Sequence, residues 1–155
     1  MTQTLQNATQ SYRCTPLIPA TILLVEDEAA VREVTREALE MGGFRVLAAD
    51  GPALAICIAA DRSNAIDLLL TDVVMPGING VELARQIHTL RPGLATLFMT
   101  GYADSEVLRQ AKLNNRQQHI KKPFTIHSLL GGVADALAAR WNGGDRKRVP
   151  QHPST

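Results

Sequence analysis

Side chains that can do chemistry follow the apolar segments of this 155-residue chain. Glu26 and Asp27 come directly after one apolar run, Asp72 after another and Thr100 after a third, while Lys122 ends a shorter and more polar segment. Three carboxylates at one place repel one another unless a cation lies among them, and a hard divalent ion such as Mg²⁺ prefers such oxygen ligands. Phosphate oxygens often complete the coordination of Mg²⁺, and lysine and threonine donors suit phosphoryl oxygens. These residue types therefore indicate Mg²⁺-dependent phosphoryl chemistry.

The segments that must position these side chains alternate between strand-length apolar runs and longer stretches of helical periodicity. This alternation is typical of βαβ units and predicts an α/β fold with a parallel sheet. The expected strands cover residues 21–25, 44–48, 66–71, 94–99 and 118–121, and the expected helices lie near 31–41, 51–62, 81–90, 103–113 and 126–137. Ligands of such sheets bind beyond the carboxyl ends of the strands. We therefore expect the active side chains to meet on one rim.

Apolar spacing predicts which helical side chains face the sheet. In the first helix, one apolar stripe is formed by Val31, Val34, Ala38 and Met41. In the last helix, an amphipathic face is formed by Ile126, Leu129, Leu130, Val133 and Leu137. Cys57 lies within an apolar helical pattern and is expected in the core, whereas His88 is expected at the surface.

The composition predicts one domain with short tails, which we place at residues 1–20, 21–140 and 141–155. A formal net charge of +1 argues against a nucleic-acid binder. No segment reaches the roughly 18 uninterrupted apolar residues of a membrane-spanning helix, and the polar start of the chain lacks the apolar run of a signal peptide. We therefore expect a cytoplasmic protein without membrane contact.

Four segments of the chain resemble the hallmark segments of the receiver domains of two-component response regulators. These segments are Leu23–Glu28, Leu68–Gly80, Phe98–Ala103 and Lys121–Phe124. Each alone has a simpler explanation, such as acids at a helix start or an aspartate in a turn. All four occur in order at the ends of expected strands. The resemblance implies a doubly wound (βα)5 domain whose five parallel strands have the order 2-1-3-4-5.

The resemblance also implies a role for each polar residue. Asp72 would accept a phosphoryl group from a phosphohistidine, and Lys122 would contact that group. The bond from this lysine to the following proline, here Pro123, is usually cis in the family. Mg²⁺ would be held by Glu26, Asp27, Asp72 and the backbone carbonyl of Val74. Thr100 would be the switch hydroxyl, which moves toward the phosphoryl group and repacks the face formed by helix four, strand five and helix five.

The chain departs from the family pattern at two positions. Glu26 stands where Asp is more common, a frequent variant that should leave function intact. His119 occupies the position of the family's switch aromatic, three residues before Lys122, so the usual coupling to the output face is in question. Tyr102, two residues after Thr100, is a bulky neighbour expected to affect access to the phosphoryl group.

Together these implications predict a bacterial signalling switch rather than a turnover enzyme. The phosphoryl donor would be a sensor histidine kinase or a histidine phosphotransfer protein. The signal would pass to an unknown downstream protein, because only 15 polar residues follow residue 140. The face of helix four, strand five and helix five would serve as the surface of a homodimer. The segment from Met99 to Ala103 resembles receivers of hybrid histidine kinases in particular, so that origin stays open.

Three alternatives from other classes also stay open. An aspartate-nucleophile phosphatase would carry a second Asp where this chain has Val74. A flavodoxin-like FMN carrier would have a loop rich in Ser, Thr and Gly where the acidic segment 26–28 repels phosphate. A phosphorylation-independent binding module would not need Asp72, Thr100 and Lys122.

Overall fold

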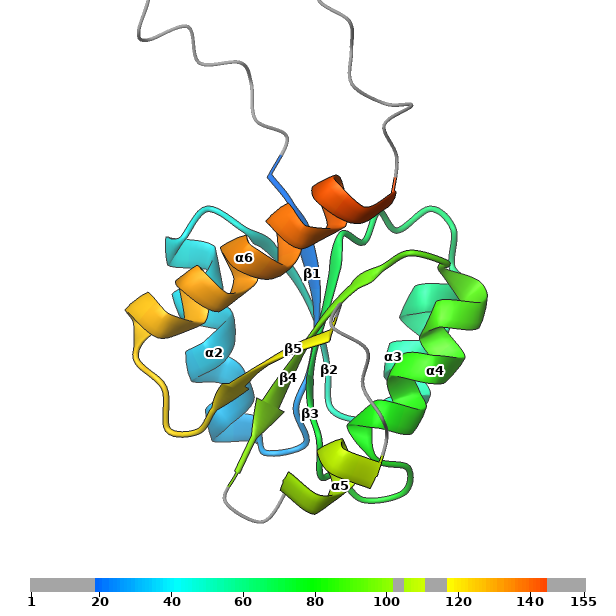
Figure 1. The fold of residues 1–155 in the computed structure, drawn as a ribbon, viewed down its shortest axis with the longest axis horizontal. Coiled ribbons are helices and arrows are strands. Elements are labelled where there is room, and N and C mark those ends of the chain that lie inside the picture. The colour runs from blue at the N-terminus through cyan, green and yellow to red at the C-terminus, as the bar shows by residue number, and fades with distance from the viewer. Residues whose placement is uncertain (1–18, 102–104, 111–116, 145–155) are drawn as a thin grey trace, which may run out of the picture.

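The computed structural model describes residues 19–101, 105–110 and 117–144 (Figure 1). One parallel sheet has the strand order β2-β1-β3-β4-β5. Its strands are β1 (Thr21–Val25), β2 (Arg45–Ala49), β3 (Leu68–Asp72), β4 (Ala95–Thr100) and β5 (Gln117–Lys121). The helices are α2 (Ala29–Met41), α3 (Pro52–Ala60), α4 (Gly80–Leu90), α5 (Ser105–Gln110) and α6 (Ile126–Gly144). This architecture confirms the doubly wound α/β fold and its strand order.

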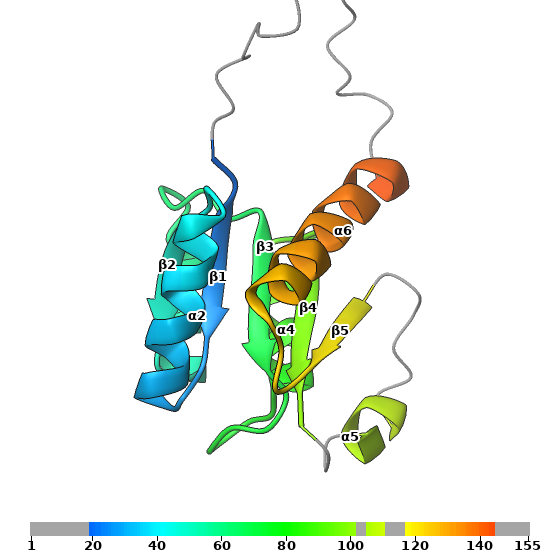
Figure 2. The same cartoon turned by 90° about the vertical axis from the view of Figure 1, so that its left-hand side faces the viewer.

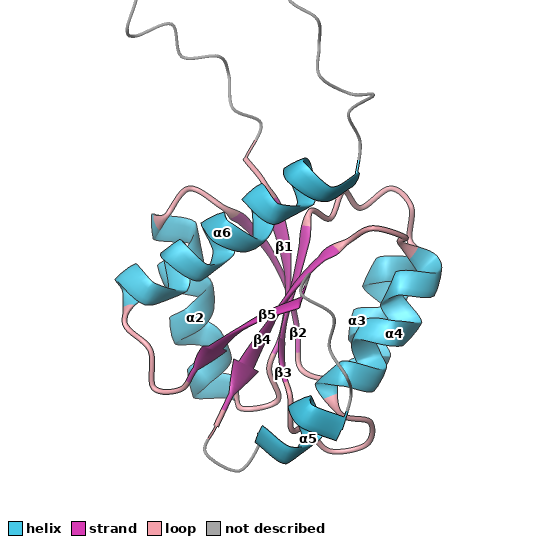
Figure 3. Cartoon of the chain, in the orientation of Figure 1, coloured by secondary structure: helices cyan, strands magenta, loops and turns pink. Residues whose placement is uncertain are grey.

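Helices cover both faces of the sheet, with α2 and α6 on one face and α3 and α4 on the other (Figures 2 and 3). Alternate residues of each strand point to opposite faces. On β1, Ile22 and Leu24 pack with α2 and α6, whereas Leu23 and Val25 pack with α3 and α4. The strand is therefore apolar along its whole length, as expected for a parallel strand buried on both sides.

The strand ends differ from the expected ones in a way that matters for the rim. Only β1 has the bounds predicted from the sequence, and the other strands differ by one or two residues at their ends. Asp72 and Thr100 are the last residues of β3 and β4, where they pair with Met99 and Lys121 of the neighbouring strands. The sheet itself therefore holds the main chain of both polar residues.

The apolar stripe predicted for α2 is wrong in part. Val34 and Met41 are 66% and 78% exposed. The residues that α2 buries are Thr35, Ala38 and Leu39. Thr35 can be buried because its hydroxyl donates to the carbonyl of Val31, 2.7 Å away in the same helix. A prediction based only on apolar residues leaves out this threonine, so the predicted face is rotated about the helix axis relative to the buried one.

Two further side chains lie elsewhere than expected. Cys57 is exposed, and α3 instead buries Ala55 and Ala59. His88 is half-buried, and its Nε2 lies 2.9 Å from the hydroxyl of Thr96 on β4. The buried face of α3 is thus formed by alanines rather than by Cys57. His88 of α4 pairs with a residue of the sheet rather than lying at the surface.

The closing helix follows its predicted face more closely. Leu129 and Val133 are fully buried, whereas Ile126 in the first turn is half exposed. The helix continues to Gly144, several residues past the boundary we expected at 140. Among the described residues, no helix has the length and apolar character needed to span a bilayer.

Candidate functional site

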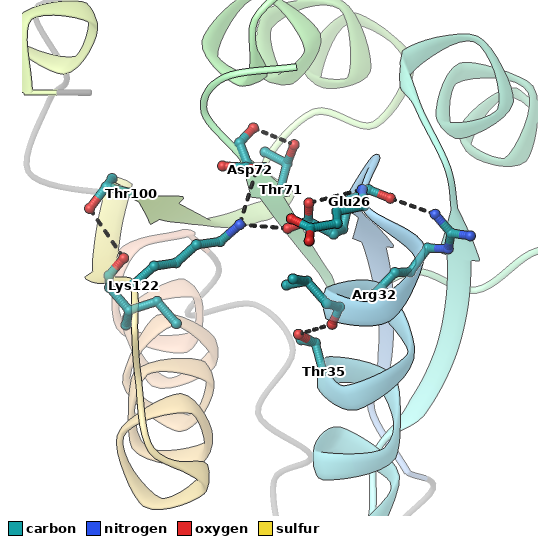
Figure 4. A network of polar contacts seen from close by, with 10 residues as sticks. Glu26, Arg32, Thr35, Thr71, Asp72, Thr100 and Lys122 are labelled. Atoms are coloured by element: carbon teal, nitrogen blue, oxygen red, sulfur yellow. Dashed lines mark hydrogen bonds and ion pairs between the residues drawn. The ribbon is translucent and has the colours of Figure 1, made fainter. Parts of the chain in front are cut away.

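Three carboxylates and one ammonium meet at the carboxyl ends of the strands. Figure 4 shows two of these carboxylates, Glu26 and Asp72, with the ammonium of Lys122 between them. Glu26 and Asp27 follow β1, Asp72 ends β3 and Lys122 follows β5. Carboxylate oxygens of Glu26, Asp27 and Asp72 lie within 4.8 Å of one another. The structure therefore brings four of the predicted site residues onto one rim, on both sides of the point where the strand order reverses.

Lys122 joins two of these carboxylates. Its Nζ donates to Glu26 Oε2 at 2.7 Å and to Asp72 Oδ2 at 3.0 Å. The side chain of Glu26 is 2% exposed and that of Asp72 is 12% exposed. Because both carboxylates are shielded from water, the Coulomb attraction between them and the ammonium is stronger than in a surface ion pair.

The electrostatics of this group depend on the lysine. Burial raises the pKa of Glu26, the Asp72 charge adds to that effect, and the contact with Lys122 opposes it. Burial by itself lowers the pKa of Lys122, but hydrogen bonds to Glu26 and Asp72 outweigh it, so that pKa lies above its ordinary value. The lysine therefore stays charged, and the carboxylates that it contacts can still attract a further cation.

The main chain at Asp72 is tightly constrained. The Thr71 hydroxyl donates to the Asp72 carbonyl at 3.0 Å, and the Val73 amide donates to the Met99 carbonyl at 3.2 Å. A Cβ atom on Gly80 would lie 2.1 Å from the Asp72 carbonyl oxygen. Only glycine fits at position 80, since no side-chain atom can approach a main-chain oxygen so closely.

The donor set fits a hard divalent cation. Glu26 and Asp72 are buried, while Asp27 is exposed and leaves room for the waters that Mg²⁺ retains. Val74 follows Asp72 by two residues in the exposed loop after β3, with a side chain that is 54% exposed. Residues Glu26, Asp27 and Asp72, with the carbonyl of Val74, would hold Mg²⁺ here.

Thr100 is buried beside this group but is directed away from the carboxylates. Its hydroxyl donates to the carbonyl of Ile120 at 3.2 Å, and its own carbonyl accepts from the Lys122 amide at 2.7 Å. Figure 4 shows Thr100 on the far side of Lys122 from Glu26. The hydroxyl thus belongs to the β4–β5 ladder in this structure.

His119 and Pro123 complete the predicted residues that the structure describes. His119 is exposed on β5, where it pairs with Phe98 of β4. Tyr102 lies outside the described residues. The Lys122–Pro123 peptide bond is cis, as the resemblance implied.

The sequence analysis missed Arg32. Its Nη1 donates to the main-chain carbonyl of Glu26 at 2.9 Å, on the opposite side of Glu26 from Lys122 (Figure 4). One signal could have revealed it. A base near the start of a helix is disfavoured by the helix dipole, so Arg32 close behind Glu26 and Asp27 called for an explanation.

Known proteins resemble this chain in sequence and in structure. The Brucella abortus response regulator receiver protein CpdR is 36% identical over 124 residues, which cover 76% of this chain and 97% of CpdR. The Brucella abortus sensor kinase CckA is 33% identical over 118 residues, which cover 76% of this chain but 12% of CckA. A response regulator receiver protein from Sinorhizobium medicae superposes with a TM-score of 0.72 at 29% identity, covering 80% of this chain and 98% of that one.

The share of each relative that is covered shows whether the similarity extends over a whole protein or over one domain of it. The chain spans less than a third of several other curated relatives. The family described as "Response regulator receiver domain" matches residues 22–134, which run from the second residue of β1 into the first half of α6. This chain therefore belongs to the response regulator receiver domain family of two-component signalling.

Proposed function

We propose that this receiver domain accepts a phosphoryl group on Asp72 from the phosphohistidine of a partner protein, in a Mg²⁺-dependent reaction. The observation that carries the proposal is the position of Lys122, whose Nζ lies 3.0 Å from Asp72 Oδ2. An ammonium at this distance would meet the oxygens of a phosphoryl group bonded to Asp72. It also lies 2.7 Å from Glu26, so it belongs to the same group that would hold the cation.

The transfer exchanges one bond to phosphorus for another. A carboxylate oxygen of Asp72 attacks phosphorus, the P–N bond of the phosphohistidine breaks, and its electron pair stays on the imidazole, which takes up a proton. The constrained main chain of Asp72 holds that carboxylate in place before the donor arrives. Bound Mg²⁺ supplies neutralisation of the charge on the phosphoryl oxygens.

The switch step starts from the hydrogen bond between Thr100 and Ile120. To donate to a phosphoryl oxygen, the Thr100 hydroxyl has to leave the Ile120 carbonyl, which it contacts at 3.2 Å. The Ile120 side chain packs with the cluster under α6. The change at Thr100 can therefore reach β5 and α6 without burial of the exposed His119.

An exposed apolar face of α2 supports a protein as the phosphoryl donor. Val34 and Met41 lie two turns apart on one face, and both are well exposed. The helix begins two residues after Asp27, so a partner that brings a phosphohistidine to Asp72 must approach this end of α2. We assign the face to a sensor histidine kinase or histidine phosphotransfer protein, whose own helix would cover the two side chains.

Phosphorylation by a small donor tests the proposal without the partner. Incubation with acetyl phosphate and Mg²⁺ should add the mass of one phosphoryl group to the wild-type chain and to Asp135→Asn, a matched change on the exposed side of α6. Asp72→Asn should gain none. Equal gain in Asp72→Asn would overturn the proposal, and sustained hydrolysis of a phosphate monoester would instead support the phosphatase alternative.

A further inference from the structure

Glu26 is held by groups from four parts of the chain. Its amide donates to the Ala49 carbonyl of β2 at 3.2 Å, and its carbonyl accepts from Arg32 Nη1 at 2.9 Å. Its carboxylate accepts from the Glu28 amide at 3.2 Å and from Lys122 at 2.7 Å. The Glu28 amide belongs to the N-cap residue of α2, and the Arg32 contact ties Glu26 to the body of that helix.

The start of α2 explains why such a contact is needed. The N-cap residue of α2, Glu28, makes no side-chain capping hydrogen bond. In α4, by contrast, the Asn79 side chain accepts from the Glu82 amide at 2.9 Å and fixes the loop that precedes the helix. The β1–α2 loop lacks this device, although it carries two of the three carboxylates.

The charge of Arg32 is poorly placed unless the contact has a purpose. A cation in the first turns of a helix opposes the helix dipole, and a guanidinium close to a cation site repels the cation. The hydrogen bond to the Glu26 carbonyl offsets the first effect, since it anchors the helix start to the end of β1. It does not offset the second.

We propose that Arg32 is a positioning residue for the cation site. By holding the main chain of Glu26, it fixes the direction in which the side chains of Glu26 and Asp27 leave the loop. The inference rests on the proposed function for the identity of the cation. It adds a residue that contacts neither the cation nor the phosphoryl group and acts through the loop.

Loss of the Arg32 charge and loss of its contact with the loop would change the Mg²⁺ affinity in opposite directions, so the direction of the change distinguishes the two roles. Arg32→Met keeps the apolar stem and removes both the charge and the donor. If Arg32 positions the loop, this variant binds Mg²⁺ about tenfold more weakly, a loss typical of groups that orient metal ligands. If Arg32 acts only as a nearby positive charge, the variant binds Mg²⁺ more tightly. Arg32→Lys, which keeps a donor and the charge, should recover most of the affinity.

The experiment is a Mg²⁺ titration of the full chain, followed through the backbone amide resonances of Asp27 and Glu28. Arg36→Met is the matched control, because Arg36 lies one turn further along α2 and pairs with Glu33 and Glu40 rather than with the loop. We expect wild-type affinity in this control and weakened binding in Arg32→Met. Unchanged or tighter binding in Arg32→Met would overturn the inference.

Two further outcomes are distinguishable. If Arg32→Met does not fold, Arg32→Gln takes its place, because its shorter amide cannot span the same distance and the same loss of affinity is expected. A wild-type chain that gains a phosphoryl group while Arg32→Met and Arg32→Gln bind Mg²⁺ normally contradicts this inference alone. A wild-type chain that binds no Mg²⁺ contradicts the inference and the proposed function together.

Discussion

The amino ends and the carboxyl ends of the strands, here called the amino edge and the carboxyl edge, differ in how their polar side chains are paired. At the amino edge, Arg91 donates to the main-chain carbonyls of Ala59 and Asp61 at 3.0 and 2.8 Å, and His88 pairs with the neutral hydroxyl of Thr96. These contacts close the α3–α4 side of the fold with matched donors and acceptors. Arg91 is thus paired with main-chain acceptors and His88 with a neutral hydroxyl, and no charges are gathered by these contacts.

At the carboxyl edge, charge is collected and left incompletely matched. Lys122 reaches across 96 residues of sequence to Glu26 and 50 residues to Asp72. Two of the three carboxylates, those of Glu26 and Asp72, contact this ammonium, and a cation or a phosphoryl group would change the charge balance. The comparison teaches that polar groups close the fold through matched contacts at one edge and gather charge for binding and chemistry at the other, and variants at the two edges should therefore behave differently.

The largest effect is expected from Lys122→Met, which leaves Glu26 buried without its partner. Loss of one member of a buried pair should lower the free energy of unfolding by about 3 kcal/mol near pH 8. The contact with Lys122 opposes the rise in the pKa of Glu26. Without it that pKa rises further above the unfolded value, so the deficit shrinks as the pH falls through it. Urea unfolding at pH 8 and pH 5 measures the deficit in the free energy of unfolding and its decrease on acidification.

Lys121→Met is the matched control for this variant. Lys121 is exposed on β5 and lies outside the acidic group, so its loss should leave unfolding nearly unchanged at either pH. An equal deficit in both variants, or one that grows on acidification, would contradict the assignment of Lys122 as the buried partner of Glu26.

The next largest effect is expected from Gly80→Ala. The added Cβ would lie 2.1 Å from the Asp72 carbonyl oxygen, so the main chain at the phosphoacceptor position has to move. We expect a destabilisation of about 2 kcal/mol, together with loss of phosphorylation by acetyl phosphate. Gly131→Ala on exposed α6, where no atom lies within 4 Å of the new Cβ, should instead stabilise the chain by up to about 1 kcal/mol.

A smaller effect, confined to the partner, is expected from Val34→Glu. A charge on the exposed face of α2 should slow transfer from a phosphorylated histidine phosphotransfer protein about tenfold, the effect of losing one good interface contact. The rate with acetyl phosphate and the Tm should not change, because Val34 is 66% exposed. Leu54→Glu, at an exposed apolar position on α3, is the control and should transfer normally. Equal slowing in both would place the partner elsewhere.

The smallest effect belongs to the amino edge and depends on pH. Burial lowers the pKa of His88, with a hydrogen bond to the main chain of Leu94 opposing it. The folded state therefore favours the neutral ring, and its stabilisation is present above the ordinary pKa of 6.5 and is lost as the pH falls through the lowered value. The Tm of the wild-type chain should fall by more between pH 7 and pH 5 than that of His88→Gln. Parallel curves would show that His88 does not contribute.

Much of the carboxyl edge could be predicted because its chemistry is written along the sequence. Glu26, Asp27 and Asp72 stand at the ends of apolar strands and Lys122 follows the more polar β5, and parallel strands bring such ends together. The strand bounds were less accurate, because main-chain pairing rather than side-chain polarity decides where β3 and β4 end. Asp72 and Thr100 are thus strand residues instead of loop residues.

Features that depend on polar groups meeting in space were not predictable in the same way. Thr35 is buried because its own helix satisfies its hydroxyl, and an apolar count cannot see that bond. Arg32 acts through a main-chain carbonyl, an acceptor that every residue possesses and no motif marks. Cys57 is exposed because alanines fill the narrow space under α3.

The most direct test of the central claim locates the phosphoryl group on the chain. Borohydride reduces an acyl phosphate to an alcohol, so a chain treated with acetyl phosphate and Mg²⁺ and then reduced should carry homoserine in place of one aspartate. Peptide mass spectrometry should find that change at Asp72 and nowhere else. Homoserine at Asp27, or no reduced residue in a chain that has gained phosphoryl mass, would contradict the account.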